Sequence, residues 1–227
     1  IKKAKEIQEL KPNKYVISVS LDGPPKAYEH IRGVDGFSRC IETYQGLKDA
    51  GIQTYFGMTI SKHNAELIND TIKAIREHIP NFDHNDLHIN IAHSSSHYYA
   101  QTIEKYPKEV VIKEIDDFIK KKSNFSSAIH FMEYQYLKNV KKYLNQDQTP
   151  VTCQSLSASC FMDSFGNIHP CGMYDKKLGN IREKPFQEIW DDAQTTRTEI
   201  VNGKCPHCWT PCEAYQSVLG NLTKIRV

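Results

Sequence analysis

The sequence predicts an α/β fold in which a parallel sheet is followed by a smaller, cysteine-rich α+β domain. Short apolar, β-branched runs alternate with segments whose apolar residues recur at helical spacing. This alternation is typical of βα units joined by right-handed crossovers. Six of the seven cysteines fall between Cys153 and Cys212. Because the stretch 146–150 is polar, we place one domain over residues 1–145 and the other over residues 146–227.

Three strands are predicted at residues 15–21, 52–60 and 87–92, each mostly apolar as in a buried parallel sheet. Helices are expected over residues 1–10, 37–47, 67–79, 111–119 and 129–144. Ser61 or Asn64 is the expected cap of the third of these, and Pro107 opens the fourth. Three strands are too few to close a barrel, so the sheet is open or part of it lies outside this chain.

Composition narrows the class of protein. The chain of 227 residues is 39% hydrophobic and 25% charged, as in ordinary globular proteins. Its net charge of +2 gives no electrostatic reason to expect nucleic acid or an anionic membrane as a partner. No apolar run is long enough to span a membrane, and we expect reduced thiols in a cytoplasmic setting.

The cysteines are spaced as Cys-x6-Cys-x10-Cys, from Cys153 to Cys171, and Cys-x2-Cys-x3-Cys, from Cys205 to Cys212. A hairpin with Gly166 in its turn is predicted just before Cys171. Three interpretations compete. Disulfides suit neither the odd count nor the expected compartment, and zinc ribbons use two Cys-x2-Cys pairs where this chain has one. An iron–sulfur cluster fits all-thiolate ligation with irregular spacing.

Polar residues follow two predicted strands. Ser20 and Asp22 end the first, where parallel folds place ligand sites, although Asp22 also suits the turn into Gly23. His93 ends the third strand, so contact with the adenine of a nucleotide cofactor is an interpretation by position alone. A metal site made by His88, His93 and His97 is disfavoured, because an odd separation puts His88 and His93 on opposite faces of a continuing strand. The loop 94–99 is either a mouth loop that touches substrate or a surface loop.

The second half of the chain resembles a known family. Cys153-x12-Gly166-x4-Cys171, then Leu178 to Ile181, a helix with Trp190, and the last three cysteines look like the SPASM or twitch extension of radical S-adenosylmethionine (SAM) enzymes. The resemblance implies that a first auxiliary [4Fe–4S] cluster is bound by Cys153, Cys160, Cys171 and Cys212. Cys205 and Cys208 would match part of a second. Because the final spacing is shortened, we expect one auxiliary cluster, and which of the last three cysteines completes it stays open.

The first half resembles the same family. Residues 18–24 and 30–37 look like the fourth strand and following loop of a radical SAM barrel, and the next two strands look like its fifth and sixth. The resemblance implies the C-terminal half of a partial (βα)6 barrel, with Ser20 as a cofactor contact. The family's Cys-x3-Cys-x2-Cys motif and its Gly-Gly-Glu stretch are absent from these 227 residues.

The resemblance also implies an activity. In the family, a second [4Fe–4S] cluster and S-adenosylmethionine generate a 5′-deoxyadenosyl radical that abstracts hydrogen from the substrate. The expected substrate is a small molecule or, by family habit, a peptide or protein, and the expected electron donor is a flavodoxin or ferredoxin. This part of the protein alone is expected to be inactive, and no residue is assigned a catalytic role. The alternative is a non-catalytic binding module stapled by zinc or by one cluster.

Overall fold

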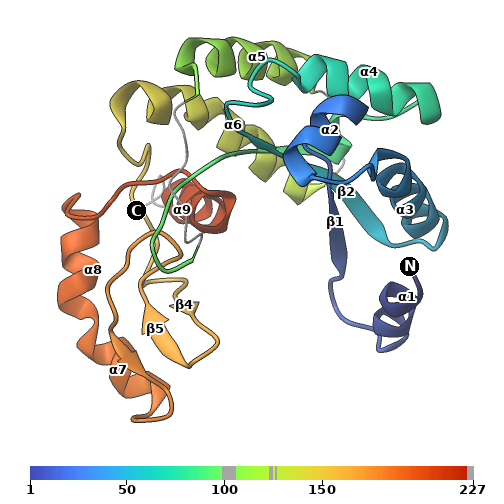
Figure 1. Cartoon of the computed structure of the whole chain (residues 1–227). Coiled ribbons are helices and arrows are strands. Elements are labelled where there is room, and N and C mark those ends of the chain that lie inside the picture. Colours follow the sequence, from blue (N-terminus) through green and yellow to red (C-terminus); the bar gives the residue numbers. More distant parts are fainter. Residues whose placement is uncertain (99–105, 123–124, 126, 224–227) are drawn as a thin grey trace. The chain divides into compact units, whose positions relative to one another are not determined.

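The computed structural model describes residues 1–98, 106–122, 125 and 127–223, which form two compact units (Figure 1). The first comprises Ile1–Ile91 and Lys105–His130, and the second comprises Ala92–Glu104 and Phe131–Val227. Helix α6 (Ala128–Gln146) begins in the first unit and continues in the second. The domain boundary at residue 145, which rests on composition, stays a prediction.

A parallel sheet forms the centre of the first unit. Its strands, in spatial order, are β1 (Val16–Ser20), β2 (Gln53–Ile60) and β3 (Leu87–Ile91). The segments between and around them form helices α1 (Lys2–Glu9), α2 (Pro25–Arg32), α3 (Phe37–Asp49), α4 (Ile68–His78) and α5 (Lys108–Lys121), with a short 3-10 helix η1 (His84–Asp86). The α/β class is therefore confirmed, and the partial barrel stays a prediction.

The two faces of this sheet differ in chemistry. Residues paired in register share a face, so Ser20 lies on the same face as Gly57 and His88. The opposite face is mostly apolar, and Phe56 and Met58 on it are fully buried. The face that carries Ser20 is the one whose chemistry suits a polar ligand.

Helix α4 lies where it was predicted, but the expected cap by Ser61 or Asn64 is wrong. Its N-cap residue is Leu67, which makes no side-chain capping bond. The buried Asn64 carboxamide instead donates to the carbonyl oxygens of Asp22 (2.8 Å) and Thr59 (2.9 Å) and accepts from the Ser61 amide (2.7 Å). The side chain is therefore used to join the ends of β1 and β2.

Three of the α-helices in the described residues were not predicted. Pro24 and Pro25 resemble a turn that ends a strand, but Pro25 occupies the first turn of α2, where its missing N–H is harmless. The other two, α8 (Gln194–Val201) and α9 (Pro211–Thr223), flank the Cys-x2-Cys pair. Helix α9 has the same proline start, and Cys212 is its second residue.

The second unit contains an antiparallel sheet with helices beside it (Figure 1). Its strands are β4 (Phe161–Met162), β5 (Asn167–His169) and β6 (Gly179–Asn180), followed by α7 (Phe186–Asp192), α8 and α9. The predicted hairpin is confirmed: Phe161 pairs with His169, and Gly166 has a φ of 85° in the turn. The Asp163 carboxylate accepts from the amide of Asn167, which closes the turn.

Buried aromatic residues join α6 to the segment that carries the last three cysteines. Trp209 is 1% exposed, and its indole N–H donates to the Tyr136 carbonyl oxygen over 2.8 Å. The Tyr215 hydroxyl donates to the buried Glu133 carboxylate over 2.5 Å. Trp209 therefore anchors the chain directly after Cys208.

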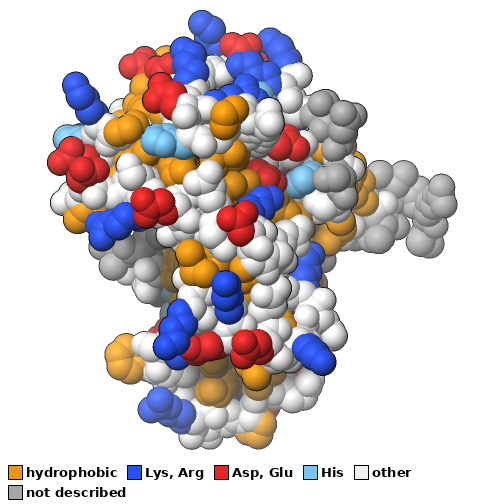
Figure 2. Space-filling view, turned by 90° about the vertical axis from the view of Figure 1, so that its right-hand side faces the viewer, with side chains coloured by type: hydrophobic (Ala, Val, Ile, Leu, Met, Phe, Trp, Pro, Cys, Tyr) orange, Lys and Arg blue, Asp and Glu red, His pale blue; other side chains and the backbone are white. Residues whose placement is uncertain are grey.

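The surface in Figure 2 carries basic and acidic side chains interspersed with one another, in keeping with the small net charge. Within the described part of the chain, no helix combines the length and apolar character needed to cross a membrane. The cytoplasmic setting stays a prediction.

Candidate metal centre

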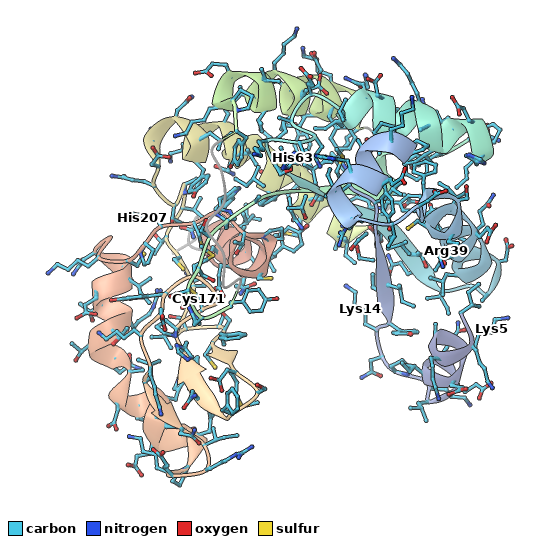
Figure 3. The ribbon with its side chains drawn as sticks, in the orientation of Figure 1. Lys5, Lys14, Arg39, His63, Cys171 and His207 are labelled. Carbon is cyan, nitrogen blue, oxygen red and sulfur yellow. The ribbon has the colours of Figure 1, made fainter. Side chains whose placement is uncertain are left out.

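Four cysteines from three separate segments line one small cavity of about 20 Å³, which we call the four-cysteine cavity. Cys153 follows α6, Cys171 follows β5, and Cys205 and Cys208 lie in the loop between α8 and α9. All four are free thiols, and Cys171 and Cys208 are each only 7% exposed. Figure 3 labels Cys171 and His207 at this site in the second unit.

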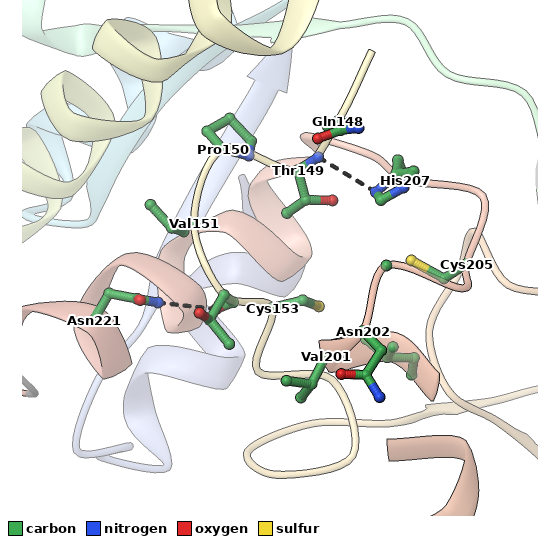
Figure 4. Close-up of a pocket in the computed structure, with 13 residues that line it drawn as sticks. Gln148, Thr149, Pro150, Val151, Cys153, Val201, Asn202, Cys205, His207 and Asn221 are labelled. Atoms are coloured by element: carbon green, nitrogen blue, oxygen red, sulfur yellow. Dashed lines mark hydrogen bonds between the residues drawn. The ribbon is translucent and has the colours of Figure 1, made fainter. Parts of the chain in front are cut away.

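The Cys-x2-Cys loop is shaped by its own backbone and by one threonine. His207 has a φ of 50°, in the left-handed region, and so turns the chain between Cys205 and Cys208. The Thr149 amide donates to His207 Nδ1 over 3.5 Å (Figure 4). The Thr149 hydroxyl donates to the Cys208 carbonyl oxygen (3.2 Å) and accepts from the Cys208 amide (3.4 Å). Thr149 thus fixes one wall of the cavity.

Backbone amides are directed at two of the sulfur atoms. The Ser155 amide lies 3.4 Å from Cys153 Sγ, and the Met173 amide lies 3.4 Å from Cys171 Sγ. Amide donors stabilise thiolate charge, and hydrogen bonds to sulfur help to set the potentials of iron–sulfur clusters.

The thiols influence one another electrostatically. Burial raises the pKa of Cys171 to about 12, and the charges of Glu213 and Cys153 also raise it. Burial raises the pKa of Cys208, with the charge of Cys171 as the next cause. Burial therefore favours the neutral thiols of Cys171 and Cys208, and their thiolates would need a positive counter-charge, which a metal centre supplies.

The other two cysteines of the stretch lie elsewhere. Cys160 and Cys212 line a cavity of about 210 Å³ together with Glu213, which we call the Glu213 cavity. The Glu213 carboxylate accepts hydrogen bonds from Ser159 (3.0 Å) and Gln216 (3.3 Å). Burial nevertheless raises the pKa of Glu213 to about 7.

An open groove of about 660 Å³ adjoins the four-cysteine cavity (Figure 4). Cys153 and Cys205 lie on its wall, and their sulfur atoms point into the same space in that view. The remaining lining residues are uncharged or histidine: Gln148, Thr149, Pro150, Val151, Thr152, Ile200, Val201, Asn202, Gly203, His207 and Asn221. The groove gives small solutes a route to two of the four sulfurs.

In the first unit, the predicted cofactor residues Ser20 and Asp22 lie at the end of β1. Ser20 is exposed on the polar face of the sheet. Asp22 is 3% exposed, and its carboxylate accepts from the Arg32 guanidinium (2.6 Å) and from the Thr59 amide (2.8 Å). The contact of either residue with a cofactor stays a prediction, and the present role of Asp22 is to join β1, α2 and β2.

His93 lies in the second unit, packed against the ring of Tyr143 at 5.5 Å. Burial lowers its pKa to about 4, and a hydrogen bond with the Trp209 backbone partly opposes this. The predicted adenine contact of His93 stays a prediction. Among the residues with described positions, no three His, Cys, Asp or Glu side chains are close enough together to hold a single metal ion. The ligands of a cubane bind four different iron atoms, so this does not test the four-cysteine cavity.

Residues 153–213 match the protein family described as SPASM, an iron–sulfur cluster-binding domain. This segment is similar to SPASM domains. Its limits enclose all six cysteines of both cavities.

Curated relatives extend the similarity beyond the SPASM domain. The chain is 26% identical over 212 residues to the AdoMet-dependent heme synthase of Oleidesulfovibrio alaskensis, covering 84% of this chain and 53% of that protein. The heme synthase of Nitratidesulfovibrio vulgaris is 28% identical over 221 residues, with 89% of this chain and 58% of that protein covered. The chain thus spans between half and three-fifths of the length of these relatives.

Solved structures share the fold. Native anSMEcpe with bound AdoMet has a TM-score of 0.53 and 16% identity, with 88% of this chain and 55% of that chain covered. A histidine-tagged form of anSMEcpe with bound AdoMet has a TM-score of 0.55 and the same identity, with 88% and 52% covered. Together with the SPASM match and the curated relatives, these confirm the resemblance to a radical SAM enzyme with a C-terminal SPASM domain.

Sequence reasoning missed two residues that shape these cavities. Thr149 lies in a stretch that reads only as a polar linker, and Glu213 carries no motif. The available signal for Glu213 was proximity in sequence, because it directly follows Cys212. Proximity alone does not say which cavity a residue faces.

Proposed function

We propose that this chain is part of a radical SAM enzyme whose SPASM domain holds one auxiliary [4Fe–4S] cluster through Cys153, Cys171, Cys205 and Cys208. The observation that carries the proposal is the convergence of these four free thiols on one cavity. Cys160 and Cys212, which the family pattern offers as ligands, line a different cavity. The geometry therefore favours Cys205 and Cys208 in their place.

The residues fit the cluster by donor chemistry. All four side chains are soft sulfur ligands, and two of them receive amide hydrogen bonds. The cavity of about 20 Å³ has room for roughly one water molecule, so its walls must separate to accept a cubane. The open groove adjoins the cavity beside Cys153 and Cys205, so the walls have room to separate on that side.

In the whole protein, the proposed reaction is the radical chemistry of the family. When bound, a second [4Fe–4S] cluster supplies the electron for reductive cleavage of S-adenosylmethionine to a 5′-deoxyadenosyl radical, with a flavodoxin or ferredoxin as the proposed donor. The residues of this chain would orient the cofactor against the polar face of the sheet, where Ser20 offers a hydroxyl. Asp22 would keep that end of β1 in place through Arg32 and Thr59.

Two substrate classes are candidates for assay in the whole protein. The curated relatives are named AdoMet-dependent heme synthases and are similar over most of this chain, so heme formation is the first reaction to assay. A peptide is the second class, because the structure of native anSMEcpe with bound AdoMet and Cp18Cys peptide has a TM-score of 0.50. Its 16% identity makes that likeness one of fold only.

Anaerobic reconstitution with iron and sulfide tests the proposal. We expect about four iron and four sulfide per chain, with a broad absorption band near ~400 nm, as for a cubane. A colourless protein that binds zinc instead would overturn the proposal in favour of a zinc-stapled module. Wild-type protein denatured before reconstitution is the control for iron bound without a folded site.

A further inference from the structure

The segment that follows β3 carries two histidines that bind the main chain beside cavity cysteines. His97 Nε2 lies 3.0 Å from the Cys171 carbonyl oxygen. His93 makes a hydrogen bond with the backbone of Trp209, the residue after Cys208. A carbonyl oxygen only accepts, so Nε2 of His97 carries the proton in this contact.

The ring of His97 is held firmly in this position. Its side chain is only 9% exposed, and it stacks on the ring of His169 with 4.6 Å between centroids. The edge of Phe161 contacts it at 5.6 Å. The preceding residue, Ser96, donates to the Asp175 carboxylate over 2.6 Å. Ser96 therefore fastens this segment to Asp175, and His97 alone contacts the main chain of Cys171.

The His97 contact lies next to a hydrogen bond that reaches the sulfur. The Cys171 carbonyl that His97 binds begins the short turn that directs the Met173 amide at Cys171 Sγ, 3.4 Å away. If the carbonyl were released, the turn could rotate and this N–H···S bond would weaken. Hydrogen bonds to cluster sulfurs favour the reduced form and so help to set the potential.

We propose that His93 and His97 are positioning residues for the auxiliary cluster. Each holds the main chain beside one cavity cysteine, Cys208 for His93 and Cys171 for His97. His97 also sustains the amide–sulfur hydrogen bond of Cys171. This inference rests on the proposed function, because it assumes a cluster in the four-cysteine cavity.

Two substitutions of His97 separate positioning from packing. His97→Phe keeps an aromatic ring against His169 but removes the donor, and His97→Gln keeps a donor near the position of Nε2. We expect the Phe variant to shift the potential of the reconstituted cluster to more negative values and to release iron to a chelator roughly fivefold faster, as for the loss of one hydrogen bond. The Gln variant should restore most of both properties.

The matched control is Ser96→Ala, which removes the bond to Asp175 and leaves the Cys171 carbonyl contact intact. Its melting temperature should fall while the potential stays at the wild-type value. His93→Phe should accelerate iron release, and His93→Asn, which keeps a side-chain donor, should not.

The outcomes are distinguishable. If wild-type protein takes up no iron and sulfide, the proposed function fails. If it does, but His97→Phe leaves the potential, the low-temperature electron paramagnetic resonance spectrum and the release rate unchanged, the inference is overturned. It is also overturned if His97→Gln behaves like His97→Phe.

Discussion

The four-cysteine cavity and the Glu213 cavity come from the same stretch of sequence but differ in size, in the number of sulfurs and in their hydrogen bonds. The first is small, is lined by four sulfurs and receives two amide hydrogen bonds on them. The second is about tenfold larger, is lined by two sulfurs and contains a buried carboxyl group. Burial and then the charge of Glu213 raise the pKa of Cys160 and Cys212, and Glu213 acts on Cys171 as well. Only the four-cysteine cavity combines four sulfur ligands with amide donors, which suits it to a cationic centre. Cysteine number and spacing did not separate these environments.

The largest effect is expected when one cysteine of each cavity is replaced by alanine. Cys208→Ala should abolish cluster binding, because three thiolates leave one iron without a protein ligand. Cys212→Ala, four residues away, should retain the cluster with unchanged iron and sulfide content. Absorption near ~400 nm and iron analysis after anaerobic reconstitution measure both. Retention by the first variant together with loss by the second would reverse our ligand assignment.

A smaller effect concerns the pH dependence of the free energy of unfolding. The residue responsible is His93, which bonds the backbone of Trp209 next to Cys208. His93 has its pKa lowered from 6.5 to about 4 by burial, so the folded chain binds fewer protons than the unfolded chain between these values. The stability that neutral His93 contributes is therefore present above pH 6.5 and is lost as the pH falls toward 4. Relative to His93→Asn, the wild type should lose on the order of 3 kcal/mol across this range.

Urea unfolding at a series of pH values, with both proteins in the same loading state, measures this difference. Parallel stability curves for wild type and variant would show that His93 does not titrate as its burial requires.

The smallest effect tests whether Thr149 holds the loop with Cys205 and Cys208, which forms one wall of the four-cysteine cavity. Thr149→Val removes the hydroxyl that bonds both the amide and the carbonyl of Cys208 and keeps the shape of the side chain. We expect a loss of about 1 kcal/mol in stability and a roughly fivefold faster release of iron. Thr152→Val, in the same segment and on the same groove, is the matched control and should change neither quantity. Equal release rates in the two variants would remove Thr149 from the site.

Much of the fold could be predicted because it depends on local pattern. The strands of the parallel sheet are apolar and β-branched, and Gly166 marks the hairpin turn by a conformation that glycine adopts easily. Helix α2 was missed because Pro24 and Pro25 mark both the end of a strand and the start of a helix. The residues around Asn64 look like the start of a helix, and so a helix cap was predicted there. The bonds that Asn64 makes to the ends of β1 and β2 join distant parts of the chain, and the local sequence gives no sign of them.

The grouping of the cysteines could not be predicted for a similar reason. Cys212 follows Pro211 into the first turn of α9, and the helix fixes it on the side of Glu213. Cys205 and Cys208 precede that helix in a loop whose path is set by Thr149 and by the left-handed His207. Such contacts join residues more than fifty positions apart, so spacing near the cysteines does not encode them.

The groove beside Cys153 and Cys205 makes the site unevenly vulnerable to air. Dissolved dioxygen arriving through it meets those two sulfurs before it meets Cys171 and Cys208, which are buried. Damage should therefore begin at Cys153 and Cys205 as sulfenic and then sulfinic acids. Peptide mass spectra of briefly aerated protein should show added oxygen on these two residues first. The protein should therefore be handled in a glove box.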